Sequence, residues 1–197
     1  RFKTEFMVQM DGIAAGSGDD SKKMLLIGAT NCPWDIDDAL FDFGFPMGPF
    51  AMSDLAGLDI GWNKETSRGE TIREKLCEND RFGQKSGKGF YIYDENRNKS
   101  SDPEVEELII NFAQEQQIKR RSINKEEIIE RCLYPMINEG FKILEEGMAI
   151  RASDIDIIWI NGYGWPVYEG GPMFYGNLIG FEKILSSFED RAKDKLT

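Results

Sequence analysis

The sequence predicts a mainly α-helical protein built from a duplicated unit, in which an aromatic loop leads into a helix. An internal repeat indicates the duplication: FGFPMGPFAMSDLAGLDIGW at residues 43–62 returns in degraded form at residues 163–181 as YGWPVYEGGPMFYGNLIGF. Apolar side chains at helical spacing along several segments indicate that the body is helical. One unbroken apolar run, MLLIGA at residues 24–29, is typical of a short buried strand.

Both copies of the repeat carry the same turn and helix-start residues. Each has an Asp-Ile-Asp lead-in, aromatic residues around a glycine and a proline, and then a Gly-Pro pair before an apolar helix. Glycine permits a tight turn, and proline fits the first turn of a helix, where its missing N–H is not needed. The repeat suits a purely architectural corner as well as a binding site. The lead-ins and pairs are residues 35–37 with Gly48-Pro49, and residues 154–156 with Gly171-Pro172.

Composition excludes several classes of function. The 197 residues suffice for one medium or two small domains, and a net charge of -11 argues against a nucleic-acid or anionic membrane partner. No apolar run approaches the roughly 20 residues that span a bilayer. Histidine is absent, which removes the commonest general base and the usual zinc ligand. The distant Cys32, Cys77 and Cys132 are expected to be buried thiols in a reducing compartment, and no metal site is expected.

In chain order, the first half predicts short elements. We expect an amphipathic helix at residues 1–12, a polar loop, the strand, and a short helix at residues 36–43. A second helix is expected from Gly48 to about Asn63. An exposed loop should follow, with one helical turn at residues 72–76. The expected core residues of the second helix are Phe50, Leu55, Leu58 and Trp62.

The glycine-rich segment GQKSGKG at residues 83–89 lacks the spacing of a nucleotide-binding loop, and residues 90–93 after it suit a short extended segment. Two interpretations stay open for it, a flexible connector and a loop reaching toward an anionic ligand.

The second half predicts longer helices. Asp102 and Pro103 suit the start of a helix that runs to Gln117. Asn124, with Glu127 three residues on, suits a capping box for the longest helix, at residues 125–146, with a kink expected at Pro135. Further helices are expected at residues 153–160 and from Pro172 to Phe188, with a charged end after them. The expected core stripe of the longest helix is Ile129, Cys132, Leu133, Met136, Ile137, Phe141 and Leu144.

Residues 1–40, a predicted helix and loop followed by MLLIGATNCPWDIDDAL, resemble part of an AAA ATPase of the microtubule-severing branch. By that resemblance Asn31 matches the sensor asparagine that positions the attacking water. The phosphate-binding loop and the acidic magnesium-binding strand of that family are not in this sequence, so no ATPase activity is expected.

From about residue 40 to residue 188, four motifs resemble the C-terminal domain of 3-hydroxyacyl-CoA dehydrogenases, above all the multifunctional enzymes of fatty-acid β-oxidation, which carry two tandem copies. The resemblance implies a duplicated helical domain like the C-terminal domain of 6-phosphogluconate dehydrogenase. It divides the chain into an ATPase-like segment (1–40), a truncated first copy with a connector (41–100) and a second copy (101–197), so the chain looks chimeric. The motifs are FGFPMGPFAMSDLAGLDIGW, RFGQKSGKGFYIYD, ERCLYPMINEGFKILEEG and NGYGWPVYEGGPMFY.

The resemblance also implies an activity for the intact enzyme. That activity is oxidation of an L-3-hydroxyacyl-CoA by NAD, with a catalytic histidine and a Rossmann domain marked by GxGxxG. The sequence contains neither, so we expect no catalytic, cofactor-binding or metal-binding residue in this chain. Where the family has an active-site asparagine, the second copy has Glu130, for which a structural role is expected. The candidate substrate-side residues are Phe45, Pro46, Met47, Gly48, Pro49 and Phe50.

Two functional hypotheses remain. The first is a substrate-side and packing fragment of the dehydrogenase, inactive alone, whose partners in the intact enzyme are the Rossmann domain and acyl-CoA. The second is a non-enzymatic helical interaction module, or a chimeric or misassembled sequence without native activity; a homodimer is a further option. The resemblance implies a peroxisome or a mitochondrion, and no targeting signal is seen.

Overall fold

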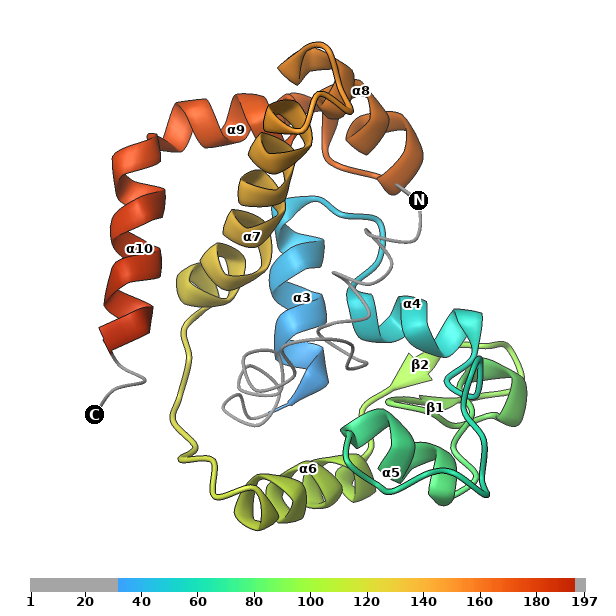
Figure 1. Ribbon diagram of the computed structural model, residues 1–197. Helices are drawn as coiled ribbons and strands as arrows, with labels where there is room; N and C mark the ends of the chain where they lie inside the picture. Colours follow the sequence, from blue (N-terminus) through green and yellow to red (C-terminus); the bar gives the residue numbers. More distant parts are fainter. Residues whose placement is uncertain (1–31, 194–197) are drawn as a thin grey trace. The chain divides into compact units, whose positions relative to one another are not determined.

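The computed structural model describes residues 32–193, and nearly all of its regular elements are helices (Figure 1). This confirms the predicted mainly α fold. The helix predicted at residues 1–12, the strand at residues 24–29 and Asn31 lie outside the described residues. None of the described helices is both long and apolar enough to cross a membrane.

The described residues form two compact units. Unit 1 comprises residues 32–42 and 47–125, and unit 2 comprises residues 43–46 and 126–193. These units and the predicted sequence copies divide the chain differently, because the second copy was placed from residue 101 onward. The assignment of sequence domains therefore stays a prediction.

Unit 1 begins with α3 (Pro33–Phe43), which contains the predicted helix and starts three residues earlier, at a proline. Its buried face includes Ile36, Ala39 and Leu40, the last two at 2% exposure. The next helix, α4 (Pro49–Ala56), starts at the predicted Gly-Pro pair.

The predicted extension of the second helix to Asn63 is wrong. Helix α4 ends at Ala56 because Gly57 has φ 107°, a value that L side chains rarely adopt, and its N–H bonds to the carbonyl of Ser53. Of the expected core residues, Phe50 and Leu58 are buried, whereas Leu55 is 56% exposed. The helical period applied to Leu55 therefore placed it on the wrong face.

The middle of unit 1 is held by short elements. Helix α5 (Ile72–Glu78) confirms the expected helical turn, and the hydroxyl of Thr71 caps it by accepting from the N–H of Glu74. A 3₁₀ turn, η1 (Gln84–Ser86), falls inside the glycine-rich segment. Strands β1 (Ile92–Tyr93) and β2 (Lys99–Ser100) pair antiparallel, with Ile92 opposite Ser100. The extended segment expected at residues 90–93 thus becomes one arm of a hairpin.

Helix α6 (Pro103–Glu115) closes unit 1 and begins as predicted. The side chain of Asp102 accepts from the N–H of Glu104, 3.0 Å away, and Pro103 takes the first position. The face of α6 formed by Val105, Ile109 and Phe112 is buried.

Unit 2 is built on α7 (Lys125–Glu145), the long helix that the sequence predicted. Most of the expected stripe is buried, but Phe141 is 39% exposed, and Gly140 and Ile143 lie on the buried face instead. The reason is a close approach: a Cβ at Gly140 would come within 2.3 Å of the Met173 sulfur. The buried face of α7 passes through Gly140, which turns Phe141 toward Phe181, 5.0 Å away between ring centroids.

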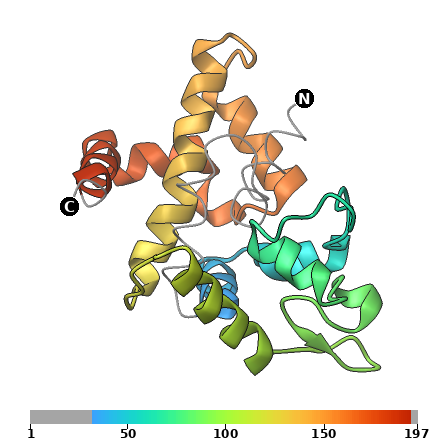
Figure 2. The ribbon, with the colours of Figure 1, turned by 60° about the horizontal axis from the view of Figure 1, so that its bottom comes forward.

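The end of unit 2 contains α8 (Ala152–Tyr163), a 3₁₀ turn η2 (Val167–Glu169), α9 (Pro172–Ile179) and α10 (Phe181–Lys193). The single helix predicted from Pro172 to Phe188 is wrong, because Gly180, at φ 93°, separates α9 from α10. The two helices leave that glycine in clearly different directions (Figures 1 and 2). Ile184 of α10 returns to pack with Tyr134 and Ile137 of α7.

The three cysteines are free and buried, as predicted. Burial raises the pKa of the Cys32 and Cys77 thiols to about 11, so both are protonated at neutral pH. A protonated thiol is a weak nucleophile.

Candidate functional site

The repeated corner has a carboxylate at the start of its helix. In unit 1, the side chain of Asp37 on α3 accepts hydrogen bonds from the backbone N–H groups of Phe50 (3.0 Å) and Ala51 (2.9 Å), at the beginning of α4. These N–H groups have no acceptor within the helix, and their dipoles favour a negative charge. Asp37 is only 1% exposed, so it satisfies buried donors.

Unit 2 contains the same arrangement. The side chain of Asp156 on α8 accepts from the backbone N–H groups of Met173 (2.7 Å) and Phe174 (3.3 Å), at the beginning of α9. The Asp-Ile-Asp lead-in therefore recurs because its second aspartate binds the start of the helix that follows the corner.

The glycine before each proline is required by this contact. A Cβ at Gly48 would lie 2.2 Å from Oδ1 of Asp37, and one at Gly171 would lie 2.4 Å from the Cβ of Asp156. Both distances are far below van der Waals contact, so only glycine lets each carboxylate reach the helix start. The repeat encodes an aspartate-to-helix clamp, which supports the architectural interpretation of the corner.

The candidate substrate-side residues divide between the two units. Phe45 and Pro46 belong to unit 2, and the other four belong to unit 1. Phe45 is buried with its ring 5.5 Å from that of Trp165, and Phe50 is buried 4.7 Å from Phe90. Of the six, Pro46 is exposed and Met47 is half-buried. A substrate-side role stays a prediction, and these two residues are the ones with accessible surface.

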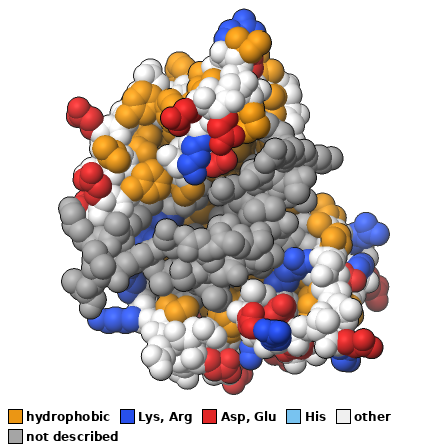
Figure 3. Space-filling model, viewed as in Figure 1, with side chains coloured by type: hydrophobic (Ala, Val, Ile, Leu, Met, Phe, Trp, Pro, Cys, Tyr) orange, Lys and Arg blue, Asp and Glu red, His pale blue; other side chains and the backbone are white. Residues whose placement is uncertain are grey.

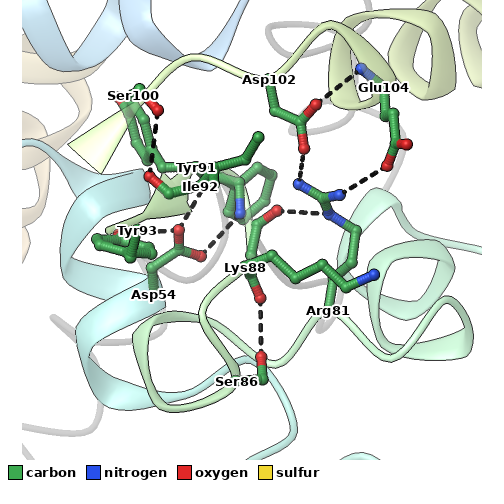
Figure 4. A network of polar contacts seen from close by, with 12 residues as sticks. Asp54, Arg81, Ser86, Lys88, Tyr91, Ile92, Tyr93, Ser100, Asp102 and Glu104 are labelled. Atoms are coloured by element: carbon green, nitrogen blue, oxygen red, sulfur yellow. Dashed lines mark hydrogen bonds and ion pairs between the residues drawn. The ribbon is translucent and has the colours of Figure 1, made fainter. Parts of the chain in front are cut away.

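A network of polar contacts in unit 1 was not anticipated from the sequence. The carboxylate of Asp54 on α4 accepts from the backbone N–H groups of Phe90 (2.9 Å) and Tyr91 (3.0 Å) and from the hydroxyl of Tyr93 (3.0 Å). Figure 4 shows Asp54 between Tyr91 and Tyr93. The hydroxyl of Tyr91 donates to Asp37, 2.7 Å away. One tyrosine therefore links two buried carboxylates, through its backbone to Asp54 and through its ring to Asp37.

Burial controls the electrostatics of this network. Loss of water raises the pKa of Asp54 to about 6 and raises the pKa of Asp37, although the hydrogen bonds to both act in the opposite direction. The Lys99 ammonium partly compensates Asp37, since it lies 3.8 Å from its Oδ2 and 4.5 Å from the centre of the Tyr91 ring. The charge of Asp54 therefore changes near pH 6.

A buried arginine fixes the opposite side of the glycine-rich segment. Arg81, at 3% exposure, donates to the carbonyl of Gly89 (2.8 Å) and forms ion pairs with Asp102 and with Glu104 (3.2 Å). A Cβ at Gly83 would lie 2.3 Å from the Asp54 carbonyl oxygen. The segment is packed against α4 and held by Arg81, an arrangement that neither interpretation of it anticipated.

A surface cleft of about 500 Å³ lies between α5, α6 and this segment. Its cations are largely compensated: Arg81 has its two carboxylates, and Lys75 lies 3.1 Å from Glu115. A cleft with balanced charges does not favour a phosphate group. The lining residues are Lys75, Asn79, Arg81, Lys88, Glu104, Glu107, Leu108, Asn111, Phe112 and Glu115.

The described contacts of Asp37, Asp54 and Asp156 join elements of the chain to one another. Within residues 32–193, no group of three or more His, Cys, Asp or Glu side chains is placed to hold a metal ion. Sequence patterns could identify Asp37 and Asp156, because the repeat marks them. They could not identify Asp54 or Arg81, because Asp54 bonds to Phe90, 36 residues away, and Arg81 pairs with Asp102, 21 residues away, without a shared motif.

Comparisons with known proteins agree with the dehydrogenase resemblance. Residues 19–93 match the sequence profile of the 3-hydroxyacyl-CoA dehydrogenase C-terminal domain. The chain is 43% identical over 179 residues to the peroxisomal bifunctional enzyme of Cavia porcellus, covering 80% of this chain and 25% of that protein. It is 35% identical over 184 residues to the glyoxysomal fatty-acid β-oxidation multifunctional protein MFP-a of Brassica napus, covering 86% and 25%.

Among solved structures, the dehydrogenase part of multifunctional enzyme 1 from C. elegans matches with a TM-score of 0.56 and 37% identity, covering 71% of this chain and 33% of that one. The chain spans about a quarter of the length of the curated relatives it matches. The matched profile begins at residue 19, so the dehydrogenase similarity extends into the segment that resembled an ATPase.

Proposed function

We propose that the chain is the substrate-side and packing part of a 3-hydroxyacyl-CoA dehydrogenase. The reason is its similarity to the C-terminal part of such dehydrogenases and of multifunctional β-oxidation enzymes. The observation that carries this proposal is the 43% identity over 179 residues to a quarter of a bifunctional enzyme. The activity of the intact enzyme would be reversible oxidation of an L-3-hydroxyacyl-CoA, with NAD as the hydride acceptor. Relatives with peroxisomal and glyoxysomal names support a peroxisomal location.

The described residues do not fit NAD themselves. A dinucleotide is held at a glycine-rich turn between a parallel strand and a helix. The sheet within residues 32–193 is one antiparallel pair of two-residue strands. The glycine-rich segment at residues 83–89 packs directly against Asp54, and Arg81 bonds to its Gly89 carbonyl, which leaves no room for a dinucleotide there. In our proposal NAD therefore belongs to a separate Rossmann part of the enzyme.

In our proposal the group that removes the hydroxyl proton lies outside this chain. Oxidation of an alcohol to a ketone by hydride transfer needs a base for that proton, and the sequence contains no histidine. The buried carboxylates Asp37, Asp54 and Asp156 are engaged with backbone N–H groups. In this proposal the chain contributes a rigid, shaped surface to the enzyme, and the chemistry takes place on the partner part.

Exposed apolar side chains on unit 2 support a packing role. Phe174 and Leu178 of α9 are 54% and 68% exposed, and Phe181 and Leu185 of α10 are 47% and 59% exposed. Figure 3 shows hydrophobic side chains gathered over these two helices. Large contiguous apolar patches are typical of surfaces that pack against another protein part. A Rossmann partner, a second copy of the chain and acyl-CoA are all proposed contacts of the intact protein.

The proposal is tested first on the chain alone. NADH consumption with acetoacetyl-CoA is measured by absorbance for the chain alone and for the bifunctional enzyme of Cavia porcellus at the same protein concentration. We expect turnover by the enzyme and none by the chain. Turnover by the chain alone would contradict the assignment of the chemistry to a separate part. Light scattering on the same sample distinguishes a monomer from a homodimer. A homodimer favours the interaction-module hypothesis, and a monomer weakens it.

The ATPase-like interpretation of residues 1–40 remains a separate proposal, and the chimera depends on it. Mass spectrometry can test whether one continuous polypeptide of this sequence exists, by detecting a peptide that spans Met24 to Arg68. If the two pieces are found only on separate polypeptides, the sequence is misassembled.

A further inference from the structure

Asp54 is an ionisable group that the packing role does not use. It is 0% exposed, and it accepts hydrogen bonds from the N–H groups of Phe90 and Tyr91 and from the hydroxyl of Tyr93. Hydrogen bonds partly replace lost water, but a buried carboxylate without a cationic partner still carries a large desolvation penalty. What faces Asp54 therefore decides how stable its charged form is.

No described cation pairs with Asp54. On α3 it faces another carboxylate, Asp37, whose charge raises its pKa further. Lys99 of β2 lies beside Asp37, and Lys85 of η1 pairs with Asp59 at 2.5 Å. The Lys88 side chain runs past Arg81, away from Asp54 (Figure 4). Tyr93 of β1 and Tyr91, just before that strand, are the remaining titratable neighbours, and both have a raised pKa, so they stay neutral.

The Tyr93 hydroxyl gives the protonated form of Asp54 a partner. A phenol can donate or accept a hydrogen bond. When Asp54 is ionised, Tyr93 donates to its Oδ2 over 3.0 Å. When a proton from solvent binds that oxygen, the same contact can reverse: the carboxyl O–H donates to the phenol oxygen. Because Tyr93 is half-buried, its own O–H can then turn toward water.

We propose that Asp54 forms a proton-sensitive latch, which holds residues 83–93 against α4 more firmly when its carboxyl is protonated, and that the Tyr93 hydroxyl bonds to both forms of this carboxyl, more strongly to the ionised one. The segment packs tightly against Asp54 at this point, because a Cβ at Gly89 would lie 2.1 Å from Oδ1 of Asp54. Water reaches the ionised carboxylate only when the segment moves away from α4. The ionised form therefore favours local opening, and protonation removes that tendency.

The direction and size of the effect follow from linkage. The pKa of Asp54 is about 6 when the segment is closed and returns to the ordinary 3.8 when it is open, so the closed form binds the proton more tightly. Closing is then favoured as the pH falls through 6. With these values, the equilibrium constant for opening is about tenfold smaller at pH 5 than at pH 7.5.

Amide hydrogen exchange on the full chain tests this directly. The N–H groups of Phe90 and Tyr91 bond to Asp54 and report the opening. After correction for the intrinsic base-catalysed rate, we expect their protection to be about tenfold higher at pH 5 than at pH 7.5, following the linkage of the Asp54 proton. Equal protection at both pH values would overturn the latch, as would an equal rise in the α7 amides, which do not touch Asp54.

Three variants assign the effect to Asp54. Asp54→Asn cannot titrate, so the pH dependence should disappear; its persistence in a folded variant would refute the proposal. Asp94→Asn removes an exposed carboxylate from the same hairpin and should leave the dependence intact. If Asp54→Asn fails to fold, Tyr93→Phe decides. It removes a hydrogen bond to the ionised form, so the midpoint should move to higher pH, and an unchanged midpoint would contradict the role of Tyr93.

Discussion

At the scale of single residues, the duplicated unit is defined by an aspartate and a glycine. Asp37 with Gly48, and Asp156 with Gly171, place a carboxylate against the first free N–H groups of a helix. Burial raises the pKa of both carboxyl groups, because it disfavours their charged form. The hydrogen bonds from the N–H groups act in the opposite direction, and each carboxylate supplies the acceptor that these buried donors need.

Replacing Asp37 by alanine should destabilise the protein strongly. Three buried donors would lose their acceptor, namely the N–H groups of Phe50 and Ala51 and the hydroxyl of Tyr91. We expect the free energy of unfolding to fall by about 2–4 kcal/mol, measured by chemical denaturation. The control is Asp38→Ala, one residue on, where the side chain is exposed and the effect should stay within about 0.5 kcal/mol. Equal midpoints for the two variants would show that the clamp has no energetic role.

Replacing Gly48 by alanine should also be unfavourable, and for a steric reason. The backbone of Gly48, at φ -80°, would accept any residue, but the new Cβ would collide with Asp37. A loss of about 1–3 kcal/mol is expected in the same denaturation measurement. Gly162→Ala, in α8 with open space around it, should be neutral or slightly stabilising. A neutral Gly48→Ala would mean that the carboxylate need not approach the helix so closely.

At the scale of elements, the sequence predicted the helices better than their ends. It correctly placed the starts at Pro49, Pro103 and Pro172, because caps and helix-start prolines are local signals. It extended two helices too far, through Gly57 and Gly180. These glycines occupy the same position in the two repeat copies, and each ends an eight-residue helix at positive φ. The repeat contained this signal, but apolar periodicity continues through both glycines.

A second limit concerned which helical face is buried. Phe141 was expected in the core, yet the close approach of Gly140 to Met173 turns it outward. The polar network of Asp54 and Arg81 escaped prediction altogether. Its contacts join residues far apart in sequence, and single-sequence patterns contain only local information about such contacts.

The break between α9 and α10 gives a test at this scale. Gly180 has φ 93° and open space around it, so Gly180→Ala would be opposed by backbone strain alone. A loss of about 1–2 kcal/mol in the free energy of unfolding is expected, without a change in helix content by circular dichroism. An increase in helix content would show instead that α9 and α10 can join into one helix, as the sequence had suggested.

At the scale of the whole molecule, the chain resembles a part of a larger enzyme. It covers 25% of the bifunctional relative, and its buried carboxylates are engaged in holding helices and a hairpin. The exposed apolar side chains of α9 and α10 suit contact with further protein. We propose that this chain can take the place of the corresponding part of a dehydrogenase.

The most direct measurement exchanges that part. In the Cavia porcellus bifunctional enzyme, the segment similar to this chain is replaced by the chain, and NADH oxidation with acetoacetyl-CoA is compared with that of the enzyme lacking the segment. We expect the truncated enzyme to be inactive and the exchanged enzyme to recover turnover within about two orders of magnitude of the original, an allowance for imperfect positioning. An exchanged enzyme that is folded, as judged by a cooperative thermal transition, but no more active than the truncated one would contradict the claim.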